Sequence, residues 1–221
     1  MNNAELIITS DGSHSLFVPE LNEHYHSIHG AVQESLHVFI RAGLNNFSAK
    51  KEISILEMGF GTGLNALLTL TENKDIPTIH YDSLEAHPLP PEITERLNFA
   101  TLIDDDNAGT LLKRMHEVAW DVKEKITEHF FLTKISTSLQ CFVPYKKYDL
   151  IYFDAFAPAV QPELWTKEIF DKMFGMLNDE GILVTYCAKG EVKRNMKAAG
   201  FVIEALPGPK GKREMTRGKK V

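Results

Sequence analysis

Apolar and polar residues follow two patterns that alternate along most of the chain. Short, largely apolar runs are typical of strands buried in a sheet, and they are separated by segments with apolar residues at helical spacing. The predicted strands cover residues 53–58, 78–84, 130–135, 148–154 and 182–186. The predicted helices cover residues 65–71, 91–100, 110–126, 163–177 and 191–199. Strands that alternate with helices predict an α/β fold, with a mostly parallel sheet and helices on both faces.

Smaller elements are expected in the N-terminal part of the chain. Residues 5–18 have the pattern of one or two short strands around the turn Asp11-Gly12, where glycine supplies a positive φ. From Ala31 the apolar residues recur at helical spacing, so a helix is predicted to run to Gly43.

The C-terminal segment predicts a different closure of the sheet. Residues 201–205 and 214–217 are expected to form an antiparallel hairpin, because a turn rich in proline and glycine separates them. The sequence therefore predicts one α/β domain over residues 51–221, with a small strand and helix extension over residues 1–50 packed on it.

The composition is typical of a globular protein. The chain has 221 residues, 43% hydrophobic and 24% charged, and this length supports a full core without covalent cross-links. Its two cysteines, Cys141 and Cys187, form no CxxC pair, which argues against a disulfide framework and the usual zinc clusters. We find no signal-peptide pattern, and no apolar run approaches the ~20 residues of a membrane helix. We therefore expect a cytoplasmic protein without membrane association.

The charge is unevenly distributed. The formal net charge of −6 argues against a nucleic-acid partner, since such domains usually carry a basic surplus. One C-terminal segment is nevertheless basic, and its cations are Lys210, Lys212, Arg213, Arg217, Lys219 and Lys220. Two interpretations remain open: a solvated tail, or a patch that binds a phosphate backbone.

The first candidate site is a glycine-rich turn that follows the strand predicted at residues 53–58. Glycines there permit a tight turn and let a ligand approach bare backbone, and the next helix offers unpaired N–H groups. A dinucleotide fingerprint would need glycine at Leu64, which makes NAD a distant alternative. The G-x-G-x-G form with an upstream acid resembles the first motif of class I S-adenosylmethionine-dependent methyltransferases. The upstream acid and the turn residues are Glu57, Gly59, Gly61, Thr62 and Gly63.

An acidic residue ends the next predicted strand. Glu85 follows residues 78–84, at a place where a carboxylate can accept hydrogen bonds from both ribose hydroxyls. Without a ligand, the turn would be a plain strand-to-helix connection and Glu85 an exposed acid. Together, at βαβ spacing, the two features favour S-adenosylmethionine as cofactor.

A second carboxylate follows the strand predicted at residues 148–154. Asp154 begins the segment DAFAP and would lie beside the methyl donor. An alkylamine substrate has a pKa of about 10 and arrives as ammonium, which Asp154 can hold and deprotonate. Phe156 can stack on a flat base, and Pro158 would stiffen the loop. The alternative interpretation of Asp154 is a turn or N-cap residue.

Four motifs together extend the resemblance to a family. LEMGFGTGLNALL, LEAHPL, FDAFAPAVQPELW and GFVIE…GPKGKREM resemble the tRNA 5-aminomethyl-2-thiouridine methyltransferases. The resemblance implies transfer of a methyl group to the aminomethyl nitrogen of the wobble uridine, with the tRNA anticodon loop as partner and no metal. Some members carry a flavin-dependent oxidase domain after the methyltransferase, and we expect none in this chain.

The resemblance also implies roles for particular residues. Those implied to bind the cofactor are Glu57, Gly59, Gly61, Thr62, Gly63, Glu85 and Asp154, of which Asp154 also faces the substrate amine. Those implied to bind the substrate are Phe156, Pro158, Tyr25, Lys212 and Arg213. The chain departs from many members at Ala155, where they have glycine, and after the third strand, where Ser136 or Ser138 stands in place of Gly-Asp. The resemblance therefore assigns no adenine contact.

Three other features have structural alternatives. The histidines around Tyr25 lack the spacing of a metal site. We expect Tyr25, His26 and Glu34 to line the crevice as a flap, although a packed helix entry is an equal alternative. Trp165 is predicted to be core rather than a platform for a base.

Two other functions are compatible with the sequence. One is a methyltransferase for a small amine or another nucleobase, which would share the cofactor site. The other is a non-catalytic RNA- or nucleotide-binding module on the same fold.

Overall fold

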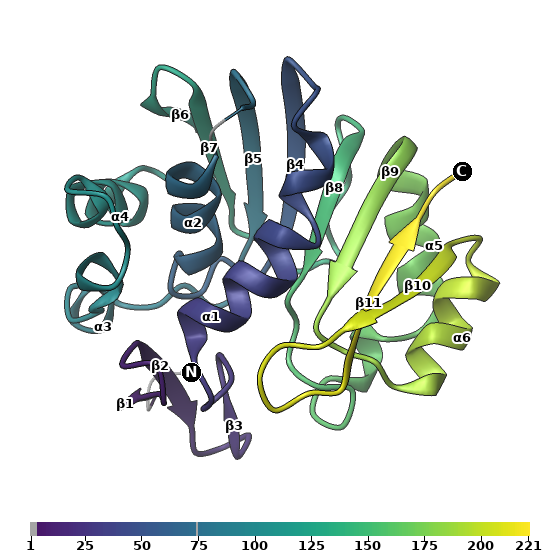
Figure 1. Ribbon diagram of the computed structural model, residues 1–221, viewed down its shortest axis with the longest axis horizontal. Coiled ribbons are helices and arrows are strands. Elements are labelled where there is room, and N and C mark those ends of the chain that lie inside the picture. The colour runs from purple at the N-terminus through teal and green to yellow at the C-terminus, as the bar shows by residue number, and fades with distance from the viewer. Residues whose placement is uncertain (1–3, 74) are drawn as a thin grey trace.

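The computed structural model describes residues 4–73 and 75–221, and within these ranges the strands form an eight-stranded and a three-stranded sheet (Figure 1). The strands of the large sheet, in spatial order, are β10 (Val202–Pro207), β11 (Glu214–Lys219), β9 (Leu177–Thr185), β8 (Tyr148–Phe153), β4 (Glu52–Met58), β5 (Thr78–Leu84), β7 (Phe130–Ile135) and β6 (Lys123–Thr127). From β9 to β7 the strands are parallel, whereas β11 is antiparallel to both of its neighbours and β6 is antiparallel to β7. All five predicted strands and the C-terminal hairpin are confirmed.

Helices cover both faces of the large sheet (Figure 1). One face carries α1 (Ala31–Ser35), its π-helical continuation (Leu36–Arg41), α2 (Leu64–Glu72), and α4 (Ala108–Glu117), with the short α3 (Pro91–Thr94) beside it. The other face carries α5 (Lys167–Met176) and α6 (Gly190–Ala198). Side chains of β4 alternate between the two cores, since Ile55 faces α2 and Leu56 faces the α5 side. In the described ranges no helix is both long and apolar enough to cross a membrane.

The prediction of one helix over residues 110–126 is wrong in its second half. Helix α4 ends at Glu117, and Val118 already has extended backbone. Asp121 has a positive φ of 63°, and the chain then enters strand β6. In β6 only Ile126 is buried, and lysines cover the exposed positions, as is common on an edge strand. The helix predicted over residues 91–100 is likewise reduced to α3 and a 3-10 turn, Phe99–Thr101.

The N-terminal sheet and the C-terminal hairpin meet at the carboxyl ends of the parallel strands. The small sheet contains β1 (Glu5–Ile8), β2 (His14–Val18) and β3 (Glu23–His24), of which the sequence predicted the first two. Figure 1 shows this sheet and the yellow β10–β11 loop at the same end of the molecule. Strand β11 lies between β9 and β10, so most of the basic segment is an interior part of the sheet, and its interpretation as a solvated tail is wrong.

Candidate active site

A cavity of about 650 Å³ opens where the parallel strands end. Its wall combines the N-terminal segment, the glycine turn, the ends of β5 and β8, and the loops after β7 and β10. Small-molecule sites usually measure ~300–1,000 Å³. The predicted site residues that line this cavity are Tyr25, Gly59, Gly61, Thr62, Glu85, Asp154, Phe156 and Lys212. The predicted site residues outside its lining are Glu57, Gly63, Pro158 and Arg213.

The glycine turn needs glycine for two different reasons. Gly59, Gly61 and Gly63 have φ values of 86°, 50° and 73°, in the left-handed region. A Cβ on Gly61 would lie 3.2 Å from the ring of Tyr25, so this glycine keeps the cavity open below that ring. A Cβ on Gly63 would instead meet the side chains of Phe60, Leu112 and His116, because Gly63 packs α2 against α4. The turn therefore has one glycine at the cavity and one that serves packing.

Glu85 is fixed to the glycine turn by the backbone. Its Oε2 accepts a hydrogen bond from Gly61 N at 3.0 Å, and its Oε1 accepts one from His87 N at 2.7 Å. Each carboxylate oxygen has a second acceptor position, so both remain able to accept from a diol. The prediction that Glu85 faces the turn is thus matched by its geometry.

Asp154 combines partial burial with a directed hydrogen bond. Its Oδ2 accepts from Asn65 Nδ2 at 2.9 Å, and the side chain follows the end of β8 into the cavity. Desolvation raises the pKa of Asp154 to about 7, an effect that Glu34 strengthens while Asn65 and Lys212 oppose it. A carboxylate with a pKa near neutrality is suited to accept and release a proton at physiological pH.

Two aromatic rings face one another across the cavity. Tyr25 and Phe156 have ring centroids 5.4 Å apart with the rings perpendicular. The loop that carries Phe156 is held from behind, because Trp165 Nε1 donates to Phe156 O at 2.8 Å. Trp165 itself is only 3% exposed, which confirms that it belongs to the core.

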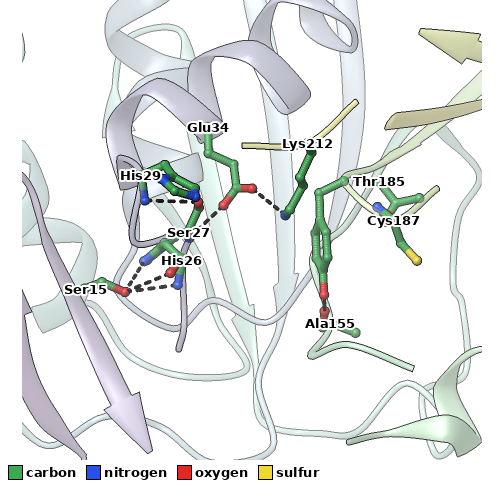
Figure 2. A network of polar contacts seen from close by, with 10 residues as sticks. Ser15, His26, Ser27, His29, Glu34, Ala155, Thr185, Cys187 and Lys212 are labelled. Carbon is green, nitrogen blue, oxygen red and sulfur yellow. Dashed lines mark hydrogen bonds and ion pairs between the residues drawn. The ribbon is translucent and has the colours of Figure 1, made fainter. Parts of the chain in front are cut away.

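An ion pair joins the N-terminal segment to the β10–β11 loop at the cavity (Figure 2). Glu34, 8% exposed, accepts from Ser27 N at 2.8 Å and from Lys212 Nζ at 2.7 Å. Lys212 Nζ also lies 3.9 Å from the ring centroid of Tyr186, whose hydroxyl donates to Ala155 O at 2.9 Å. The predicted N-terminal flap is therefore confirmed in position: Tyr25, His26 and Glu34 all line the cavity.

The sequence analysis missed several residues of the cavity. Asn65 was assigned only to the helix after the turn, although a lone amide at the start of an apolar helix was a usable signal. Tyr186 ends the segment predicted as the fifth strand, one position before the strand-end residues singled out from the sequence. The loop at residues 137–140 also lines the cavity, at the place where the family pattern failed to assign an adenine contact.

The histidines near the cavity act as neutral packing groups. Burial lowers the pKa of His26 to about 4, and its Nε2 lies 3.4 Å from Thr62 Oγ1. His116 has a pKa lowered to about 4 by burial, and its Nε2 lies 3.1 Å from Thr62 O. In the described ranges no three His, Cys, Asp or Glu side chains gather as metal ligands would.

The cavity fits an adenosyl cofactor in its chemistry. Gly59 and Gly61 expose backbone beside the Glu85 carboxylate, and the loop at residues 137–140 supplies further wall. A glycine turn after the first parallel strand of the domain and an acid after the next, at the carboxyl edge of a doubly wound sheet, define a class I methyltransferase site. A family model described as S-adenosyl-L-methionine-dependent methyltransferase matches residues 108–221, about half of the chain. The chain belongs to this family.

Characterised relatives point in the same direction. A tRNA 5-methylaminomethyl-2-thiouridine biosynthesis bifunctional protein MnmC from Burkholderia multivorans is 29% identical over 97% of this chain and 34% of that protein. The protein of that name from Cupriavidus metallidurans is 30% identical over 96% of this chain and 33% of that protein. The chain thus spans about a third of the length of these relatives. The crystal structure of MNMC2 from Aquifex aeolicus superposes with a TM-score of 0.78 at 25% identity, covering 99% of this chain and 70% of that one.

Proposed function

We propose that the protein transfers a methyl group from S-adenosylmethionine to the aminomethyl nitrogen of the wobble uridine in tRNA, giving 5-methylaminomethyl-2-thiouridine. The observation that carries this proposal is one cavity in which Glu85 and the glycine turn lie on one side and Asp154 on the other. The name shared by the relatives supplies the substrate class.

The proposed chemistry assigns separate tasks to the two carboxylates. S-adenosylmethionine, when bound, supplies an electrophilic methyl group on its sulfonium. Glu85 accepts hydrogen bonds from the ribose hydroxyls, while Gly59 and Gly61 leave room for the cofactor backbone. Asp154 takes a proton from the substrate ammonium, so that the nitrogen lone pair can form the new N–C bond as the C–S bond breaks.

The proposed substrate contacts begin with the two facing rings. A base displaced from an anticodon loop can stack on aromatic side chains such as Tyr25 and Phe156. Lys212 is paired with Glu34 inside the cavity, whereas Lys210 and Arg213 are exposed. We therefore assign backbone phosphate contacts to Lys210 and Arg213.

The paired cations of β11 have structural tasks instead. Arg217 Nε lies 2.5 Å and Lys219 Nζ 2.9 Å from the carboxylate of Glu204, and Lys220 Nζ donates to Leu177 O at 2.9 Å. Deleting the whole basic segment would remove a strand from between β9 and β10. A test of tRNA binding therefore needs the exposed pair Lys210→Ala and Arg213→Ala rather than a truncation.

The domain division and the location belong to the same proposal. Residues 1–50 would form an extension that closes the cavity against a catalytic domain of residues 51–221, with residues 1–3 lying outside the described residues. The enzyme would act in the cytoplasm, on tRNA and without a metal ion.

The test is methyl transfer to tRNA from cells that lack this modification. The purified protein, cofactor and tRNA are incubated, and the digested nucleosides are analysed by mass spectrometry. The expected result is 5-methylaminomethyl-2-thiouridine with the native protein and none with Asp154→Asn, although the variant still binds the cofactor. Cofactor binding without methyl transfer to tRNA would refute the tRNA assignment, and transfer to free small amines alone would favour the small-amine alternative.

A further inference from the structure

A buried polar cluster lies directly behind Asp154. Glu57 is 1% exposed and stands at the end of β4, outside the cavity lining where direct cofactor contact was expected. Its Oε2 accepts from Ser83 Oγ at 2.6 Å. The groups that face its carboxyl are Ser83 and Tyr81 of β5, Asn65 of α2 and Asp154 after β8. None of these four side chains is a cation.

The hydrogen bonds of this cluster leave acceptor atoms without donors. Glu57 Oε1, Asn65 Oδ1 and the Tyr81 hydroxyl are buried and have no hydrogen-bond partner. A carboxylate and an amide oxygen are both acceptors, so Glu57 Oε1 and Asn65 Oδ1 cannot satisfy one another without an added proton. Leaving a buried charged carboxylate with a single hydroxyl donor is costly.

A proton on Glu57 resolves this arrangement. We propose that Glu57 is a protonated carboxylic acid in the working enzyme and donates to Asn65 Oδ1, and that Asn65 thereby holds Asp154 as the anion that accepts the substrate proton. Glu57 is then a positioning residue rather than a cofactor ligand. This assignment rests on the proposed methyl transfer for its meaning in catalysis.

The opposite distribution of the proton has a different consequence. If Glu57 were the anion, Asn65 would turn its amide toward Glu57 and its oxygen toward Asp154, which would have to be protonated. Asp154 would then be unable to accept a proton from the substrate ammonium. Burial raises the pKa of Glu57 to about 8 and that of Asp154 to about 7, an order that agrees with the proton residing on Glu57.

Two substitutions distinguish the two arrangements by activity. Glu57→Gln keeps a neutral side chain that can donate to Asn65, so it is expected to retain most of the methyl transfer, while Glu57→Ala is expected to lose at least tenfold. Asn65→Leu removes the donor to Asp154, and the acid limb of the pH–rate profile should move up by about one pH unit. Glu57→Gln as inactive as Glu57→Ala, or an unmoved acid limb in Asn65→Leu, would overturn the proposal.

A spectroscopic measurement decides the protonation state without any substrate. Infrared difference spectra of the native protein against Glu57→Gln at pH 7 should contain the C=O stretch of a protonated carboxylic acid. A carboxylate band in its place would overturn the proposal. Because this measurement needs no methyl transfer, failure of the tRNA assignment and failure of the Glu57 assignment remain distinguishable, even where Glu57→Ala does not fold.

Discussion

Replacing Glu57 with glutamine is expected to change how the stability of the protein depends on pH. The unfolded chain ionises this residue near its ordinary pKa of 4.5, whereas burial holds the folded pKa at about 8. Between these values the folded state binds a proton that the unfolded state has released. The stability of the native protein therefore falls as pH rises through this window, and the contribution is absent below pH 4.5.

The size of this effect follows from the two pKa values. Each unit of difference corresponds to ~1.36 kcal/mol, so the cost of keeping Glu57 protonated is about 3 kcal/mol at pH 7 and about 5 kcal/mol above pH 8. Glutamine has nearly the same shape and no proton to gain. Glu57→Gln should therefore become progressively more stable than the native protein as pH rises from 4.5 to 8.

The assay is urea-induced unfolding of both proteins at a series of pH values from 4.5 to 8.5. The quantity compared is the difference between the two free energies of unfolding at each pH, in which the titrations of shared groups largely cancel. We expect this difference to grow toward glutamine and to level off above pH 8. A difference that stays constant with pH would refute a buried, protonated Glu57.

Further substitutions test the cavity itself. Gly61→Ala places a methyl group 3.2 Å from the Tyr25 ring at a positive φ, so calorimetry should find S-adenosylmethionine binding weakened about tenfold, while Gly175→Ala, with open space around its Cβ, should bind normally. Glu85→Gln should weaken cofactor binding by about tenfold or more, because it removes the charged acceptor for the ribose hydroxyls; unchanged affinity would contradict that role. Tyr186→Phe removes the hydroxyl that donates to Ala155 O, and kcat for methyl transfer should fall about fivefold at unchanged cofactor affinity; a change in affinity alone would contradict this.

The sheet was predictable because its strands are buried on both faces. Residues 130–135 and 148–153 are nearly continuous apolar runs, a pattern that fixes a central strand without tertiary information. Strand β6 was missed because KEKIT has only one buried apolar side chain, and its pairing with β7 depends on a long-range contact. Local pattern therefore predicted the interior of the sheet better than its edge.

The site was predictable where a motif ends a strand. Glu85 and Asp154 could be found in this way because the ends of parallel strands share one edge of the sheet. The pair of Lys212 with Glu34 joins residues 178 positions apart, and no local pattern encodes it. Glu57 was assigned to the cofactor from its place in a motif, but only the packing of α2 on β4 shows that its side chain lies behind the cavity.

The most direct test of the account is a crystal structure of the protein with S-adenosylhomocysteine. We expect the ligand in the cavity, with its ribose hydroxyls on Glu85, its amino-acid portion over Gly59 and Gly61, and its sulfur facing Asp154. A ligand bound elsewhere, or an Asp154 side chain turned away from the sulfur, would contradict the assignment of both carboxylates.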